Sequence, residues 1–279
     1  MSLGIAFKGT EGIVLAADSR VTLNAARPQP NGQVLVLPAT FDNATKLLRV
    51  KGQDYVGAVT YGVGAIGQQS PRTAHSFLPE LEANISTKHN TARLSVEDFA
   101  KELSVFFLDQ WNTQMVGIPA QPGNDMVFLI GGYDHQAPYG RVFEFYIPNR
   151  PIPTERYAGP GEFGAVWGGQ RQFVDRLLNG YDPRVLDLAE SELGLDAAAK
   201  ARLAQKLGEL GTPIPYPFLP LQDCVDLSIF LVRATMKLQT WTVDVRGVGG
   251  AVDVATITKT DGFNAVQLKQ VTGEKHLYW

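Results

Sequence analysis

The chain has almost no cysteine, and this excludes two kinds of site. Cys224 is the single cysteine among 279 residues, so neither an intramolecular disulfide nor a cluster of cysteine ligands can form. The four histidines, at positions 75, 89, 135 and 276, lack the spacing of metal ligands. We therefore expect no metal site and no metal-dependent reaction.

The chain also lacks an excess of basic charge and long apolar runs. Lysine and arginine total 25 against 28 acidic residues, so we expect no nucleic-acid partner. No apolar run approaches the roughly 18 residues that a membrane-spanning helix needs. The first nine residues, MSLGIAFKG, lack the pattern of a signal peptide. We expect a cytoplasmic protein with no membrane partner.

Short apolar runs arrive in pairs separated by turns, which predicts antiparallel hairpins. The paired runs are 3–7 with 12–18, 46–50 with 55–60, 126–132 with 141–147, and 252–258 with 265–268. The segment 24–33 is rich in proline, asparagine and glycine and is expected to be a loop. Pro148, Pro151 and Pro153 are expected to close the third pair.

Helical periodicity appears at about 65–85, 95–116, 170–179, 183–210 and 222–238. Ser95, with Asp98 three residues later, resembles a capping box at the start of the second helix. Because strands and helices each arrive in groups, a doubly wound parallel sheet is disfavoured. We predict a single α+β domain over 1–279, a four-layer αββα sandwich of two antiparallel sheets.

Ser2 is the first candidate for chemistry. Removal of Met1 would leave a serine whose hydroxyl and α-amine belong to one residue, and an α-amine with a pKa of about 7.7–8.0 can accept the proton of that hydroxyl. Such a site needs a nearby cation and a carboxylate that positions it. Asp18, at the end of the second strand, and Lys46, at the start of the third, fit these roles. Each alone is explained more simply, as a turn carboxylate and a solvated lysine.

Several segments together resemble the proteasome β-subunit family of N-terminal-nucleophile hydrolases. They are GIVLAADSRVT at 12–22, KLLRV at 46–50, YVGAVTYG at 55–62, DLSIFLVRA at 226–234 and GGAVDVATIT at 249–258. The resemblance implies that Ser2 is the nucleophile, Asp18 and Lys46 its catalytic partners, and Gly62 a donor to the oxyanion. It also implies that Thr22 binds the substrate main chain. The segments 24–40 and 183–217 are then insertions.

The chain departs from the family at three places. Ser2 replaces the usual threonine. Gly168-Gly169-Gln170 stands where the family has a serine between glycines. Val245 to Val248 stands where it has an aspartate and a serine, although Asp244 could replace the acid. We therefore expect fewer hydroxyl groups to support the nucleophile.

One motif points elsewhere. Residues 62–67, GVGAIG, match the dinucleotide-binding pattern after a strand and are expected to open a helix. The next expected element is another helix, whereas dinucleotide binding requires a parallel βαβ unit. We expect no nucleotide and no other cofactor.

The main hypothesis is an amide hydrolase, a peptidase-like enzyme that acts on peptide or protein substrates through an acyl-enzyme on Ser2. Two alternatives stay open: a proteasome-like assembly subunit with little or no hydrolysis, and an acyl-amidase for small substrates. The resemblance further implies a homo-oligomer, a ring or ring-like assembly, and a regulatory ATPase as a candidate partner.

Overall fold

The computed structural model describes residues 2–29, 31–90, 92–159, 161–243 and 245–272. Within these ranges the chain forms six α-helices, two short 3-10 helices and three antiparallel sheets. The expectation of a mixed fold with antiparallel sheets is therefore confirmed.

The first large sheet holds the beginning and the end of the chain. Its strands follow the order β10-β1-β2-β11-β12. Their bounds are β1 (Leu3–Lys8), β2 (Ile13–Asp18), β10 (Gly164–Gly169), β11 (Val252–Thr258) and β12 (Gly262–Gln267). Because Leu3 pairs with Gly169, the end of β10 lies directly beside Ser2.

The second large sheet is built from the middle of the chain, in the order β5-β6-β7-β8-β9. Its strands are β5 (Leu47–Leu48), β6 (Val56–Gly62), β7 (Met126–Gly132), β8 (Arg141–Ile147) and β9 (Arg150–Arg156). Strand β9 was not expected, because its two prolines argue against a strand. Its side chains alternate between half-buried and exposed, and its position at the sheet edge tolerates proline.

The two large sheets pack face to face. Alternation along β2 sends Leu15 and Ala17 into this interface, where they meet Val59 of β6 and Leu129 of β7. The intervening residues of β2, Val14 and Ala16, point to the opposite face. Both faces of β1 and β2 are therefore buried, which explains why these strands are almost continuously apolar.

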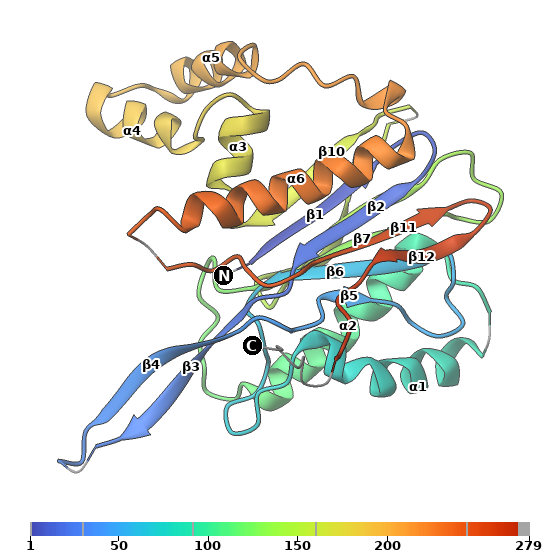
Figure 1. Ribbon diagram of the computed structural model, residues 1–279, viewed down its shortest axis with the longest axis vertical. Helices are drawn as coiled ribbons and strands as arrows, with labels where there is room; N and C mark the ends of the chain where they lie inside the picture. Colours follow the sequence, from blue (N-terminus) through green and yellow to red (C-terminus); the bar gives the residue numbers. More distant parts are fainter. Residues whose placement is uncertain (1, 30, 91, 160, 244, 273–279) are drawn as a thin grey trace, which may run out of the picture.

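Helices cover the outer faces of both sheets, as Figure 1 shows. Helices α1 (Leu78–His89) and α2 (Val96–Gln114) cover the second sheet, with Phe99, Leu103 and Phe107 at helical spacing on the buried side. Helices α3 (Gln172–Leu178) and α6 (Leu221–Gln239) cover the first sheet. Ser95 caps α2 as expected, because its hydroxyl accepts a hydrogen bond from Asp98 N at 3.0 Å.

The loop predicted at 24–33 is wrong: β3 (Val21–Pro28) and β4 (Val34–Phe41) form a hairpin that projects from the body of the molecule (Figure 1). Gln29 N donates to Gln33 O across the turn at 2.8 Å, and Gly32 adopts a φ of 79°. The glycine and asparagine therefore occupy only the tip of the hairpin. Strand β4 exposes four successive apolar side chains, Val34, Leu35, Val36 and Leu37.

Two of the expected helices are shorter than predicted. The first begins at Leu78, after a 3-10 turn over Ala74–Phe77, because Gly67 (φ 117°) and Pro71 interrupt the preceding segment. The pattern at 183–210 forms two helices, α4 (Arg184–Leu193) and α5 (Ala197–Gly208), because Gly194 ends α4 in a left-handed conformation. A 3-10 turn over Tyr216–Phe218 follows α5.

Within the described ranges, none of the helices is long and apolar enough to cross a membrane. The same residues hold no group of three or more side chains suited to bind a metal ion.

Truncation of Leu129 tests the packing of the two sheets. We expect Leu129→Ala to lower the free energy of unfolding by about 2–5 kcal/mol, because the side chain is fully buried and leaves a cavity. Chemical denaturation measures this loss. Leu188→Ala, at a side chain 59% exposed on α4, is the control and should change little. Equal effects of the two substitutions would contradict the observed packing.

Candidate functional site

Asp18, at the end of β2, lies at the centre of the candidate site and is fully buried. Its Oδ1 accepts hydrogen bonds from Lys46 Nζ at 2.6 Å and from Leu3 N at 3.0 Å. Its Oδ2 accepts from Gly249 N at 3.0 Å and Arg20 N at 3.1 Å. One carboxylate thus joins its own segment to three others, at Leu3, Lys46 and Gly249.

Lys46 is 6% exposed and directs its ammonium group to Asp18. Its carbonyl oxygen accepts from Thr60 N at 3.0 Å, which anchors the lysine backbone to β6. Burial lowers the pKa of Lys46, and the opposing attraction of Asp18 raises it. The lysine is therefore an internal cation held by a buried carboxylate, not the solvated lysine of the simpler interpretation.

Ser2 lies at the start of β1 beside this pair, since the amide of the next residue, Leu3, binds Asp18. Its carbonyl oxygen accepts from Gln170 N at 2.8 Å. Its Oγ lies 3.5 Å from the carbonyl oxygen of Arg20, a long contact, and the residue is 3% exposed. Met1 lies outside the described residues. The structure thus brings Ser2, Asp18 and Lys46 together.

Gly62 ends β6 with a φ of 86°, a conformation that suits glycine. A Cβ atom there would lie 2.1 Å from the carbonyl oxygen of Asp125, so a larger residue would force the backbone to move. Amides alternate in direction along an antiparallel strand. The Thr60 N–H points toward the side of β5, where it binds Lys46 O, so the Gly62 N–H points to the same side. Because β5 pairs with β6 only at Ala58 and Val59, the Gly62 N–H lies beyond the end of that pairing.

The Tyr61 side chain, near the end of β6, packs against the start of β1. Its ring lies so close to Gly4 and Gly168 that a Cβ atom at either glycine would overlap it. Gly62, the next residue, is thereby held near the β1 end that carries Ser2. Thr22, on β3, is half-buried, and its buried hydroxyl has no hydrogen-bond partner among the described residues.

The motif at 62–67 does not open a helix, contrary to the expectation. The segment after β6 is irregular and contains only an isolated bridge between Ile66 and Arg72 before the 3-10 turn at Ala74. The second sheet is antiparallel throughout, so the motif lacks the βαβ unit of a dinucleotide site.

Two glutamines near Ser2 were missed by sequence reasoning. Gln239, 2% exposed at the end of α6, donates its amide to Gln170 Oε1 and accepts from Val248 N at 3.1 Å. Gln170 also donates to Val245 O at 3.3 Å. The side-chain amides of Gln170 and Gln239 therefore link the two segments, at 168–170 and 245–248, where the family has supporting hydroxyl groups. Asp244 lies outside the described residues.

Arg20 is a third residue near the site that sequence reasoning missed. It forms a bidentate ion pair with Asp42, with N–O distances of 2.5 and 2.8 Å, and also donates to Arg246 O at 2.9 Å. The hydrogen bonds raise the pKa of Arg20 and lower that of Asp42. Its position two residues after Asp18 was visible in the sequence, but its partners Asp42 and Arg246 come from other segments.

A second buried ion pair lies beside the first. Asp253 of β11 is 1% exposed, binds the ammonium group of Lys269 and accepts from Ser19 Oγ at 3.3 Å. The positive charge of Lys269 contributes to the lowered pKa of Lys46, while Asp253 opposes it. The electrostatic environment of Lys46 therefore depends on the end of the described chain.

Comparison of the chain with models of known protein families and with curated protein sequences gives no match.

Removal of one partner tests the buried pair. We expect Lys46→Met to lower the free energy of unfolding by about 3–5 kcal/mol, because it leaves the Asp18 carboxylate buried without its cation. Chemical denaturation measures the loss, and Lys51→Met, at an exposed lysine, is the control.

A double-mutant cycle with Asp18→Asn separates the coupling of the two charges from the loss of packing and of backbone hydrogen bonds. Asp18→Asn/Lys46→Met removes both charges, so its loss of stability should be smaller than the sum of the losses of the two single variants. Losses that add within about 0.5 kcal/mol would contradict the role assigned to the pair.

Proposed function

We propose that this protein is an N-terminal serine amide hydrolase with the four-layer αββα sandwich of the N-terminal-nucleophile hydrolases. The fold proposal is supported by the packing of two antiparallel sheets between α1 and α2 on one side and α3 and α6 on the other. The functional proposal is supported above all by Asp18 Oδ1, which binds both Lys46 Nζ and the amide that follows Ser2.

In the proposed reaction, Ser2 Oγ attacks the carbonyl carbon of an amide. The α-amine of Ser2, freed by removal of Met1, accepts the hydroxyl proton through a water molecule. Lys46 lowers the pKa of that amine by its positive charge, and Asp18 orients Lys46. The Gly62 N–H donates to the oxyanion that forms.

Collapse of the tetrahedral intermediate breaks the C–N bond, and the α-amine returns the proton to the leaving amine. Water then hydrolyses the resulting ester and restores Ser2. The substrate is a peptide or protein in this proposal, and Thr22 aligns its main chain. The regulatory ATPase implied by the resemblance stays a prediction.

Replacement of the nucleophile tests the proposal. We expect Ser2→Ala to reduce the hydrolysis of a panel of fluorogenic peptides by at least about a hundredfold, because it removes the attacking oxygen. Ser191→Ala, at an exposed serine of α4, should retain full activity. Mass spectrometry of the intact wild-type protein is run in parallel, since a chain that keeps Met1 lacks the free amine. Full activity of Ser2→Ala would contradict the proposal.

Self-association is part of the same proposal. The hairpin of β3 and β4 is supported on neither edge by a large sheet, and β4 exposes Val34 and Val36 at 60% and 56%. Such an apolar surface is typical of a protein interface. It supports the homo-oligomer implied by the resemblance.

We expect Val34→Thr/Val36→Thr to shift the protein toward smaller species in sedimentation velocity, because it reduces apolar area while β-branching is preserved. Val271→Thr, at an exposed valine distant in sequence from the hairpin, is the control. A wild-type protein that is monomeric at all concentrations would contradict self-association.

A further inference from the structure

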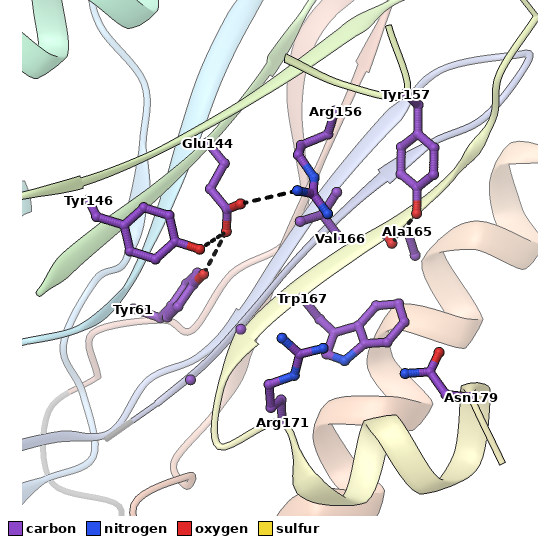
Figure 2. Close-up of a pocket in the computed structure, with 12 residues that line it drawn as sticks. Tyr61, Glu144, Tyr146, Arg156, Tyr157, Ala165, Val166, Trp167, Arg171 and Asn179 are labelled. Atoms are coloured by element: carbon purple, nitrogen blue, oxygen red, sulfur yellow. Dashed lines mark hydrogen bonds and ion pairs between the residues drawn. The ribbon is translucent and has the colours of Figure 1, made fainter. Parts of the chain in front are cut away.

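A polar cavity of about 440 Å³ lies between the two large sheets, beside the end of β10. Figure 2 shows its lining, in which side chains from β6, β8, β9 and β10 meet Arg171 and Asn179 from the region of α3. Its volume is typical of a site for a small molecule. None of the roles proposed for hydrolysis uses the charged side chains that line it.

Glu144 of β8 supplies a negative charge to the cavity wall and is 9% exposed. Its Oε1 accepts hydrogen bonds from Tyr61 Oη at 3.0 Å and Tyr146 Oη at 2.7 Å. Burial raises the pKa of both tyrosines, so both hydroxyls stay protonated as donors at neutral pH. The two tyrosine hydroxyls therefore bind Oε1 and fix the orientation of the Glu144 carboxylate.

The second oxygen of Glu144 has room for a ligand. Its contact with Arg156 Nη1 is 3.9 Å, which exceeds hydrogen-bond distance. Figure 2 shows Arg156 and Glu144 pointing toward each other at the same end of the cavity. An ammonium group placed at Oε2 would gain a charge-assisted hydrogen bond with a carboxylate that is already desolvated.

Positive charge lines the cavity as well. Arg171 binds Asp175 through Nε at 2.8 Å and Nη2 at 3.0 Å, while its Nη1 is engaged by none of the described residues. Arg156 is half exposed, and among the described residues its guanidinium has only one ion pair, the long contact to Glu144. Guanidinium groups with free donors are suited to bind a carboxylate.

The charges of the wall select against a ligand with one sign of charge. A simple anion would meet the Glu144 carboxylate, and a simple cation would meet two arginines. The rings of Tyr157 and Trp167 also line the cavity, on the side of the two arginines away from Glu144 (Figure 2), and provide apolar area. The lining thus combines an acceptor for an ammonium group, donors for a carboxylate and a surface for a side chain.

We propose that this cavity binds a zwitterion with the chemistry of a free α-amino acid or a short peptide. The ammonium group binds Glu144 Oε2, and the carboxylate binds Arg156 and Arg171. The side chain packs against Tyr157 and Trp167. This binding site is separate from the proposed nucleophile and does not require hydrolysis.

The cavity has a structural connection to Ser2. Gly168 and Gly169 form part of its wall, and Gly169 approaches Ser2 so closely that an added Cβ atom would lie 1.8 Å from the Ser2 carbonyl oxygen. The next residue, Gln170, donates its N–H to that same oxygen. A ligand in the cavity therefore contacts the segment that holds the Ser2 backbone.

Titration with L-phenylalanine tests the proposal, with isothermal calorimetry and the intrinsic tryptophan fluorescence, to which Trp167 contributes, as readouts. We expect saturable binding to the wild-type protein and equal binding to Ser2→Ala, so the result is independent of the proposed hydrolysis. N-acetyl-L-phenylalanine lacks the ammonium group and L-phenylalanine amide lacks the carboxylate. Each should bind at least about tenfold more weakly.

Two variants assign the groups of the wall. Glu144→Gln keeps an acceptor for the tyrosine hydroxyls but removes the charge, and Arg156→Gln changes a half-exposed side chain. Both should weaken L-phenylalanine binding at least about tenfold, whereas Arg202→Gln on α5 should not. Circular dichroism melts confirm that each variant is folded.

Three outcomes would overturn the proposal: no saturable binding of L-phenylalanine, equal binding of the N-acetyl derivative, which would indicate a plain anion site, and unchanged binding to both Glu144→Gln and Arg156→Gln.

Discussion

The ion pair between Asp18 and Lys46 is the interaction on which the rest of the candidate site depends. Both groups are buried, so each charge is tolerable only because the other lies 2.6 Å away and backbone amides satisfy the remaining carboxylate positions. Those amides come from the start of β1 and from Gly249. The pair therefore joins the two neighbours of β2, the start of β1 and the segment that leads into β11, at one point, with Lys46, directly before β5, as the third contributor.

The second constraint on the candidate site is the close approach of other groups to the backbone of three glycines in β1 and β10. Gly4 and Gly168 leave space for the ring of Tyr61, and Gly169 leaves space for the Ser2 carbonyl oxygen. The same glycines bring β1 and β10 close to Tyr61 of β6, whose hydroxyl binds Glu144 of β8 in its own sheet. The cavity wall at β10 and the position of Ser2 thus both depend on the absence of side chains at these backbone positions. The two proposed sites therefore lie on either side of one short segment.

The hairpins and the helix cap at Ser95 could be predicted because alternation, short turns and capping residues are local signals. The grouping of Ser2, Asp18 and Lys46 was expected from the resemblance, since each residue alone had a simpler explanation. Local composition misled at 24–33, where proline, asparagine and glycine suggested a loop although most of these residues belong to a hairpin of β3 and β4. Strand β10 and the contacts of Gln170 and Gln239 were not predicted either. They depend on pairing between residues far apart in the chain, for example Leu3 with Gly169, and composition carries no information about such pairing.

The central claim is that Ser2 acts with its own hydroxyl and its own free amine. A peptide epoxyketone tests both at once, because its two electrophilic carbons close a ring only with a hydroxyl and an amine on one residue. After incubation, peptide mapping by mass spectrometry should find one probe molecule on the amino-terminal peptide that begins at Ser2, and none on Ser2→Ala. An unmodified protein, or an adduct at any other residue, would contradict the account.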